Sequence, residues 1–181
     1  MSEPREVDFP DQIRQALSKQ LNAELASSYL YFRYGAICSL MSLKGWANWF
    51  FKHANEESGH ARKITEYIID RGSMPVFSRI EATRLALKTI RSPEDTLNQL
   101  ITIFRDVVQR EKDTSNAIIQ IRRMAIALED ETTAEFLSWF IKEQIEEVAT
   151  PKEYLDKLQM SPPVVNANFL TQLDKEFNEA Q

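Results

Sequence analysis

Acidic and imidazole side chains interrupt an apolar stripe in residues 44–70, which otherwise have the pattern of a buried helix. One face of this helix carries residues at steps of four and three, namely Trp46, Phe50, His53, Glu57, His60, Ile64 and Tyr67. Glu57 and His60 therefore fall where apolar residues are expected. A solvated surface cluster is the default explanation of such charges, because charged groups are rarely buried without partners. The large apolar neighbours argue against that default.

The same interruption recurs on three more predicted helices. Glu24 follows two leucines on the buried face of the first helix, and Glu111 occupies an apolar position on the third. Gln144 and Glu147 lie one turn apart on the fourth. Polar groups thus occur near the middle of every long helix, with large apolar side chains on either side.

Several buried carboxylates together indicate a metal site. An isolated buried carboxylate costs several kcal/mol and normally becomes neutral, and neighbouring carboxylates repel one another. A divalent cation turns this repulsion into ligation. Glu57 and His60 project from one turn and can reach one ion, while the second oxygen of Glu57 can bridge to another. Carboxylates with one imidazole suit Fe(II) or Mn(II), and iron is the chemically productive choice.

The elements that must position these groups are predicted to be helices. The 181 residues include only four glycines, and the prolines fall at ends and breaks. Ser92 and Pro93 provide a helix start, and Gly72 provides a stop. The pattern predicts helices over 10–38, 44–70, 93–127, 130–158 and 165–178, with a connection over 73–91. We expect a single all-α domain, residues 1–181, folded as a four-helix bundle with a long crossover between the second and third helices and a short fifth C-terminal helix.

Composition excludes several classes of protein. The formal net charge is −5, and no basic stripe with interleaved aromatic residues occurs, so nucleic acid is not an expected partner. No run of 18 apolar residues occurs, and a membrane span is not expected. A single cysteine, Cys38, and the lack of an apolar signal segment at the start favour a cytoplasmic location.

Four segments resemble the core helices of ferritins, specifically the non-haem bacterial-type branch: QLNAELASSYLYFRYG, WFFKHANEESGHARKITEYI, QREKDTSNAI and FLSWFIKEQIEEVATPKEYLDKL. The resemblance extends to the tail helix and so covers nearly the whole chain. It implies a di-iron ferroxidase centre. In that centre Glu24 and His60 would hold the first iron and Glu57 would bridge. Glu111 and Glu147 would hold the second iron.

The resemblance also assigns groups around this centre. Gln144 would lie beside it as a hydrogen-bonding or weakly liganding group, and Tyr31 is similar to the family's nearby tyrosine, which can donate an electron or a hydrogen bond. An adjoining third iron site would use Glu56, Glu143, Glu146 and Glu147. Ser58 stands where bacterioferritins have a haem-binding methionine, so haem is not expected. His53 is expected to pack or to orient a ligand.

The function implied by the resemblance is iron storage and detoxification. The protein would oxidise Fe(II) with dioxygen and deposit Fe(III) mineral inside a hollow homo-oligomeric shell. In this family the shell has about two dozen subunits, so a 24-mer is expected. Two alternatives remain open from the residues. A di-iron redox enzyme acting on peroxide or a small substrate is expected to have a second E-x-x-H, whereas both histidines here lie in residues 44–70. A purely structural bundle would not bind iron.

Other residues have structural interpretations. Trp46, Trp49 and Trp139 are expected in the core, with the alternative that Trp139, one turn before Glu143, senses or shields the iron site. Cys38 is expected as a small buried hydrophobe. The tail helix should dock through an apolar face formed by Phe169, Leu170, Leu173 and Phe177.

The route by which iron would enter is not fixed by the sequence. Ala134 and Leu137 stand where animal ferritins place acids, so an acidic threefold channel of the animal type is not expected. Nearby acids offer an alternative, although acids at a helix start are also ordinary capping residues; these are Glu129, Asp130, Glu131 and Glu135.

Overall fold

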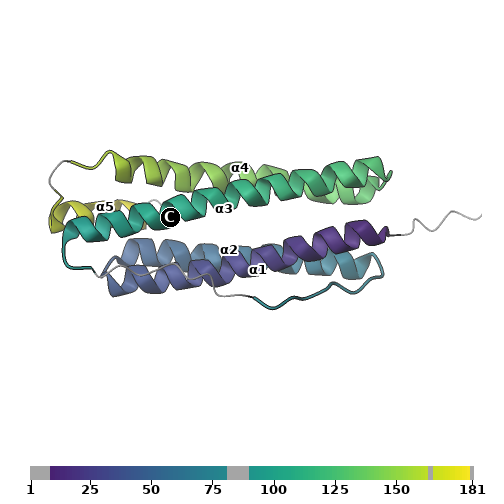
Figure 1. Cartoon of the computed structure of the whole chain (residues 1–181), viewed down its shortest axis with the longest axis horizontal. Coiled ribbons are helices and arrows are strands. Elements are labelled where there is room, and N and C mark those ends of the chain that lie inside the picture. The colour runs from purple at the N-terminus through teal and green to yellow at the C-terminus, as the bar shows by residue number, and fades with distance from the viewer. Residues whose placement is uncertain (1–8, 81–89, 163–164, 180–181) are drawn as a thin grey trace, which may run out of the picture.

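The computed structural model describes residues 9–80, 90–162 and 165–179, and the regular structure in these ranges is helical (Figure 1). The helices are α1 (Asp11–Leu40), α2 (Lys44–Asp70), α3 (Pro93–Ala127), α4 (Glu131–Gln159) and α5 (Ala167–Glu179). The predicted all-α fold with four long helices and a short fifth is confirmed. The predicted bounds hold for α2 and α3, and those of α1, α4 and α5 differ by one or two residues. None of the helices described is long and apolar enough to cross a membrane.

Local sequence signals set several helix ends. The Ser92 hydroxyl accepts a hydrogen bond from the backbone N–H of Asp95 at 3.1 Å, with Pro93 in the first turn of α3. Gly72 has φ of 75° just after α2, a conformation that side chains disfavour. Asp130 caps α4 by accepting from the N–H of Thr133 at 3.1 Å.

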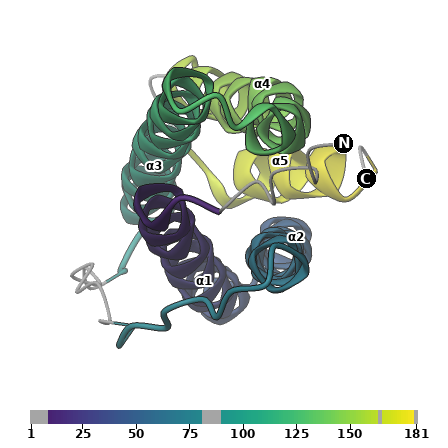
Figure 2. The same ribbon diagram turned by 90° about the vertical axis from the view of Figure 1, so that its right-hand side faces the viewer.

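The long helices form two pairs, α1 with α2 and α3 with α4, seen end-on in Figure 2. The crossover from α2 to α3 begins along the outer side of α1. Ser18 accepts a hydrogen bond from the N–H of Val76 at 3.1 Å, and Asn22 donates to the Val76 carbonyl at 2.7 Å and accepts from the N–H of Ser78 at 2.8 Å. These bonds hold the first part of the crossover against α1. Residues 81–89 of the predicted connection lie outside the described residues.

Two apolar clusters fill the bundle on either side of its middle. One lies towards the start of α1 and includes Leu17, Ile64, Ile118 and Phe140. The other lies towards the end of α1 and includes Tyr34, Trp46, Phe50 and Phe104, together with the tail helix. The acids that interrupt the stripes lie between these clusters, so a polar layer is enclosed by apolar packing.

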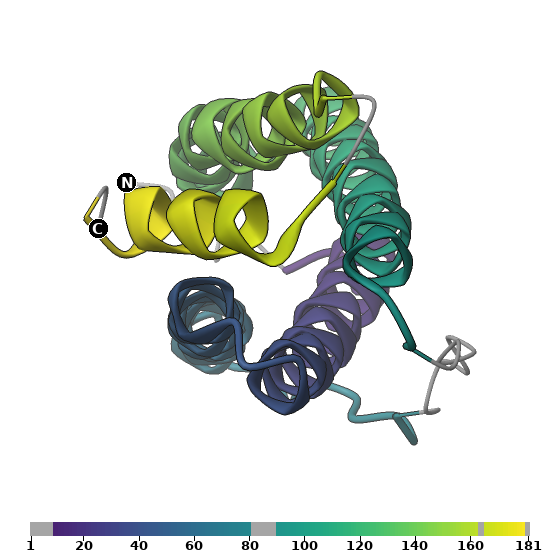
Figure 3. The same ribbon diagram turned by 90° about the vertical axis from the view of Figure 1, so that its left-hand side faces the viewer.

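Helix α5 lies across one end of the bundle, between α2 and α4 (Figure 3). Leu170, Leu173 and Phe177 are buried, and the ring of Phe177 packs on Trp46 with centroids 3.4 Å apart. The carboxylate of Asp174 accepts a hydrogen bond from the backbone N–H of Trp46 at 3.0 Å. Docking of the tail through its apolar face is therefore confirmed, and α5 also supplies the cap that the first residues of α2 lack.

Candidate metal centre

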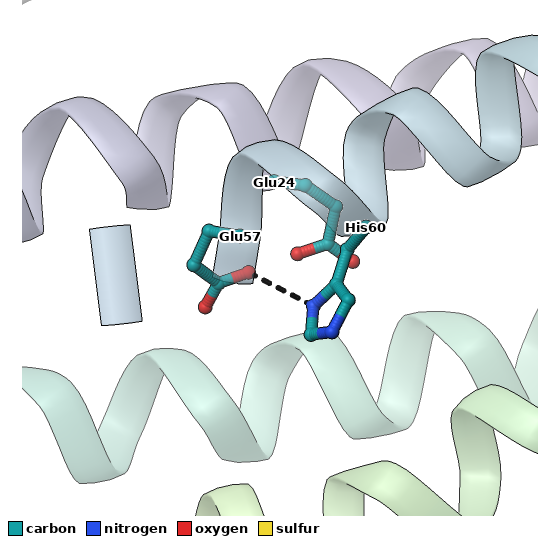
Figure 4. A group of neighbouring side chains, drawn as sticks. All are labelled: Glu24, Glu57 and His60. Carbon is teal, nitrogen blue, oxygen red and sulfur yellow. Dashed lines mark ion pairs between the residues drawn. The ribbon is translucent and has the colours of Figure 1, made fainter. Parts of the chain in front are cut away.

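Three of the long helices contribute buried carboxylates to one place in the bundle. Glu24 comes from α1, Glu57 from α2 and Glu111 from α3, and their exposed fractions are 1%, 3% and 3%. His60 projects from the same side of α2 as Glu57, and the two side chains converge with Glu24 in Figure 4. Helix α4 adds Glu147, whose side chain is 14% exposed. Acids at apolar stripe positions are thus buried in the bundle rather than solvated.

Four buried atoms of this cluster make no hydrogen bond: Glu24 Oε2, Glu57 Oε2, His60 Nδ1 and Glu111 Oε2. His60 Nδ1 lies 3.4 Å from Glu57 Oε2 and 3.5 Å from Glu147 Oε1. Buried polar atoms in proteins nearly always have a partner, and each one without a partner costs free energy. Oxygen and imidazole donors left open in one place are the donor set that divalent iron or manganese requires. The residues present therefore fit a metal site.

The potential ligands form three groups in which one ligand atom per residue lies within 4.8 Å of the others. The first group is Glu24, Glu57 and His60, and the second is Glu57, Glu111 and Glu147. Glu57 belongs to both groups, as a bridging carboxylate must. A third group joins His60, Glu147 and Glu143 at the edge of the cluster.

Burial and mutual repulsion raise the pKa of these carboxyls. Burial is the main cause at Glu24 and at Glu57, and the neighbouring carboxylates add to the shift. At Glu111 burial also raises the pKa, while a hydrogen bond from Tyr31 opposes the rise. Burial raises the pKa of Glu147 to about 8. Without metal, the centre therefore holds protons that a cation would displace.

Neighbouring polar groups orient the acids. Gln20 donates to Glu24 at 2.7 Å, and the Tyr31 hydroxyl donates to Glu111. Ser115 donates to the amide oxygen of Gln144 at 2.8 Å, and the Gln144 amide nitrogen donates to Glu147. Gln144 thus links Ser115 of α3 to Glu147 through two hydrogen bonds.

Sequence reasoning did not single out Gln20 as a residue of the site. It is buried, with 3% of its surface exposed, and precedes Glu24 by one turn on the same face of α1. That spacing is the signal by which it could have been found.

A cavity of about 330 Å³ adjoins the buried centre between α2 and α4. Its lining includes the four acids of the predicted third site: Glu56, Glu143, Glu146 and Glu147. Glu56 and Glu146 are exposed, and Glu143 is half-buried. The structure thus brings these four acids to one solvent-open cavity. Two of them, Glu143 and Glu147, also approach His60.

His53 packs at the edge of the same cavity. Its ring stacks on Trp49 with centroids 3.8 Å apart, and its Nδ1 lies 3.0 Å from the Trp49 carbonyl oxygen. Burial lowers the pKa of His53 to about 4. At neutral pH the ring is therefore uncharged, and its Nδ1–H donates to that carbonyl. The expectation of a packed histidine is confirmed.

The three tryptophans differ in position. Trp46 and Trp49 are buried, with exposed fractions of 0% and 2%, as expected for core residues. Trp139 was expected in the core, and this prediction is wrong because 38% of its surface is exposed. Its ring meets the edge of His60 at a centroid distance of 5.6 Å, and the ammonium group of Lys63 lies 3.6 Å from its centroid. Trp139 therefore shields the imidazole from solvent.

Two further expectations concern packing. Cys38 is fully buried, and burial raises the pKa of its thiol, as expected of a small hydrophobe. Asp130 is 2% exposed and pairs with Arg71 at 2.9 Å, so this acid holds the α2 end to the α4 start. Ala134 and Leu137 are also buried within the subunit.

Four long helices that enclose carboxylates and one imidazole at mid-length are the arrangement of the helix-bundle class of carboxylate metal proteins. The model of the ferritin-like domain matches residues 14–161, and the chain belongs to the ferritin family, in its bacterial type. A bacterial non-heme ferritin of Staphylococcus epidermidis is 30% identical over 167 residues, which cover 91% of this chain and 95% of that protein. One from Escherichia coli O157:H7 is 30% identical over 152 residues, covering 84% and 86%.

Solved structures give the same result. An open pore ferritin from the archaeon Archaeoglobus fulgidus superposes with a TM-score of 0.84 at 27% identity, covering 97% of this chain and 99% of that one. A form of the Archaeoglobus fulgidus ferritin engineered to be closed superposes with a TM-score of 0.82 at 28% identity, covering 96% and 98%. The arrangement of α1 to α5 is therefore that of ferritins.

Proposed function

We propose that the protein oxidises Fe(II) with dioxygen at the buried carboxylate pair of sites and stores the Fe(III) as mineral inside a homo-oligomeric shell. The observation that carries this proposal is a set of buried donors without hydrogen-bond partners, which lie in two groups of potential ligands that share Glu57. Such groups do not stabilise a purely structural bundle, because replacing buried charged groups with apolar residues often leaves the folding stability unchanged or raises it. Membership in the ferritin family agrees with it.

The ligand residues would form two binding positions, one for each of two Fe(II) ions bound as substrates. Glu24 and His60 hold one Fe(II), Glu111 and Glu147 hold the other, and Glu57 bridges them. Carboxylate oxygens are hard anionic ligands and stabilise Fe(III) relative to Fe(II), which favours loss of an electron to dioxygen. Tyr31 and Gln144 orient the second position through hydrogen bonds to Glu111 and Glu147. The apolar clusters on either side exclude bulk water along the bundle axis, and the pair opens to solvent through the adjoining cavity.

The adjoining cavity suits a transfer site for the product. Glu56, Glu143 and Glu146 line it, and Glu147 belongs both to the cavity and to the second position. An ion displaced from the pair would move from enclosed acids to solvent-open ones without leaving oxygen ligands. We infer a third iron site of lower affinity here. Ser58 is exposed on α2, and we propose that the protein takes no haem.

Assembly into a shell is supported by the apolar surface of α1. Tyr29 and Phe32 are 54% and 59% exposed, and with Ile80 of the crossover they line a groove of about 440 Å³. Exposed apolar residues gathered in one groove are typical of interaction surfaces. We propose that it packs against a second copy in a homo-oligomer of about two dozen subunits.

The test adds Fe(II) to metal-free protein in air and follows Fe(III) absorbance, with analytical ultracentrifugation in parallel. We expect rapid oxidation and a large hollow particle that becomes denser as iron is added. Oxidation no faster than in buffer would refute the ferroxidase proposal. Oxidation by a small oligomer that keeps its iron would instead indicate a di-iron redox enzyme.

A further inference from the structure

A second buried tyrosine, Tyr34, lies beside Tyr31 on α1. The ring centroids are 6.5 Å apart, and Phe50 packs against both rings at 6.1 and 5.5 Å. Tyr31 is 1% exposed and Tyr34 is fully buried. Because the Tyr31 hydroxyl donates to Glu111, the two rings form a short aromatic path that leads away from the carboxylate cluster.

The hydroxyl of Tyr34 has a fixed proton acceptor on α3. It donates to Asp106 Oδ2 at 2.7 Å, and Arg110 Nε donates to the same oxygen at 2.8 Å. The side chains of Asp106 and Arg110 are 29% and 27% exposed. A buried phenol is therefore joined through one carboxylate to solvent, at a distance that allows direct proton transfer.

This pairing matters for redox chemistry because a tyrosine that loses an electron must also lose its phenolic proton. Burial raises the pKa of Tyr34, followed by the effect of the Asp106 hydrogen bond, so the resting group is a neutral phenol. The phenolic proton leaves only when an electron leaves as well, and the Asp106 carboxylate can accept that proton. Tyr67, by contrast, shares its hydroxyl with Thr133 and Arg71, neither of which is a base.

We propose that Tyr34 is a redox-active tyrosine that returns an electron to Tyr31 after Tyr31 has been oxidised at the iron pair. The inference rests on the proposed ferroxidase function, in which dioxygen is the oxidant. Full reduction of dioxygen takes four electrons, and two Fe(II) ions supply two. A third Fe(II) ion at the adjoining site supplies one more by becoming Fe(III), and Tyr31 supplies the fourth by losing an electron to the reacting pair and its proton to Glu111.

The transfer between the tyrosines balances as follows. The Tyr31 phenoxyl radical regains the proton from Glu111 and takes one electron from Tyr34, while Tyr34 passes its proton to Asp106. The products are neutral Tyr31 and a Tyr34 phenoxyl radical beside protonated Asp106. A further Fe(II) ion then reduces this radical, becoming Fe(III), and Asp106 returns the proton. Tyr34 thus moves the oxidising equivalent away from the centre, which is left free to react again.

The test is rapid freeze-quench electron paramagnetic resonance on metal-free full-length protein mixed with Fe(II) and dioxygen. We expect two tyrosyl signals in sequence, both narrowed when the tyrosine rings are deuterated. In Tyr34→Phe the second signal should vanish and the first should live severalfold longer, with the initial rate of Fe(III) formation unchanged. Asp106→Asn should weaken or delay the second signal, because an amide cannot take the proton.

Controls separate this inference from the proposed function. Tyr67→Phe removes a tyrosine hydroxyl in the other apolar cluster and should leave both signals as they are. Tyr31→Phe should abolish both. If the parent protein oxidises iron but gives no tyrosyl radical, or if Tyr34→Phe shows the parent's signals and lifetimes, Tyr34 is no relay and the ferroxidase proposal stands. If the parent does not oxidise iron, the proposed function itself fails.

Discussion

At the scale of single residues, Glu57 faces both proposed iron positions, and its carboxylate is buried among others of the same charge. We predict that Glu57→Gln lowers the rate of Fe(III) formation by at least about tenfold, because the amide cannot bridge two cations. The same change should stabilise the metal-free protein by about 1–3 kcal/mol, since folding forces Glu57 either to bury a charge or to take up a proton, and the amide does neither. Stopped-flow absorbance and urea denaturation measure the two effects.

Glu66→Gln is the matched control on α2, because Glu66 is exposed and pairs with Arg62 at the surface. Its effect on stability should stay within about 1 kcal/mol, and the oxidation rate should not change. If Glu57→Gln instead lowers the stability of the metal-free protein, the acids of the cluster stabilise the fold by pairing with one another, without a bound metal.

The titration of Glu147 gives a second prediction at this scale. Its pKa rises from the ordinary value of 4.5 to about 8, so between these pH values the unfolded chain has lost a proton that the folded chain keeps. Raising the pH then favours unfolding. We predict that the melting temperature of the metal-free protein falls as pH rises from 4.5 to about 8.

Calorimetry at a series of pH values tests this, with Glu147→Gln as the comparison, for which the slope should be smaller. Anaerobic Fe(II) should reverse the trend, because metal binding competes with protons and strengthens as pH rises. An unchanged slope in Glu147→Gln would assign the titration to another group.

Residue types and spacing predicted much of the candidate centre. Glu57 and His60 share a turn, and an acid at an apolar stripe position is visible in the sequence. The groups around them were harder to predict. Ser115 and Gln20 act through hydrogen bonds, and many buried polar residues do so without any functional role. The exposure of Trp139 depends on the rotation of α4 about its own axis. The apolar periodicity of a single helix does not fix that rotation closely enough to decide whether a residue at the edge of the buried face is covered.

At the scale of elements, the contact between α2 and α5 depends on the absence of a side chain. A Cβ at Gly45 would overlap the backbone carbonyl of Asp174. We predict that Gly45→Ala displaces α5 and costs about 1–3 kcal/mol of unfolding free energy. Limited proteolysis should cut the tail faster in this variant, and urea denaturation measures the loss.

Gly59→Ala is the control on the same helix, because nothing lies within 4 Å of the Cβ it would add. Alanine in the interior of an exposed helical face should stabilise α2 by about 0.5–1 kcal/mol. Equal losses in both variants would mean that helix distortion, and not the contact with α5, causes the effect.

Element positions were more predictable than their contacts. Ser92, Pro93 and Gly72 are local signals that act within one turn, and the ends they predict agree with the structure. The docking face of α5 follows from its apolar periodicity. Its site on α2 does not, because Trp46 and Asp174 are brought together only by the finished bundle.

At the scale of the whole molecule, the apolar groove on α1 should control assembly. We predict that Phe32→Lys combined with Ile80→Lys yields small oligomers or monomers instead of a shell, because two charges would be buried in the contact. Subunit stability should change by no more than about 1 kcal/mol, since both side chains are exposed in the isolated chain.

Phe32→Leu combined with Ile80→Val keeps the groove apolar and should still assemble. Sedimentation velocity distinguishes the outcomes. Shells of normal size in the double lysine variant would place the subunit contact elsewhere. The fold of one subunit was predictable from sequence because each helix carries its own pattern, whereas assembly depends on surfaces whose partner lies in another chain.

The cap that Asp174 forms on α2 has a consequence for folding during synthesis. Helix α2 carries Glu57 and His60, and its first turn is completed by a residue translated long after it. A nascent chain that has left the ribosome only through α4 has the proposed iron ligands but an open bundle end, where Trp46 lacks its cover from Phe177. Emergence of α5 closes that end, so this part of the core is completed only late in translation.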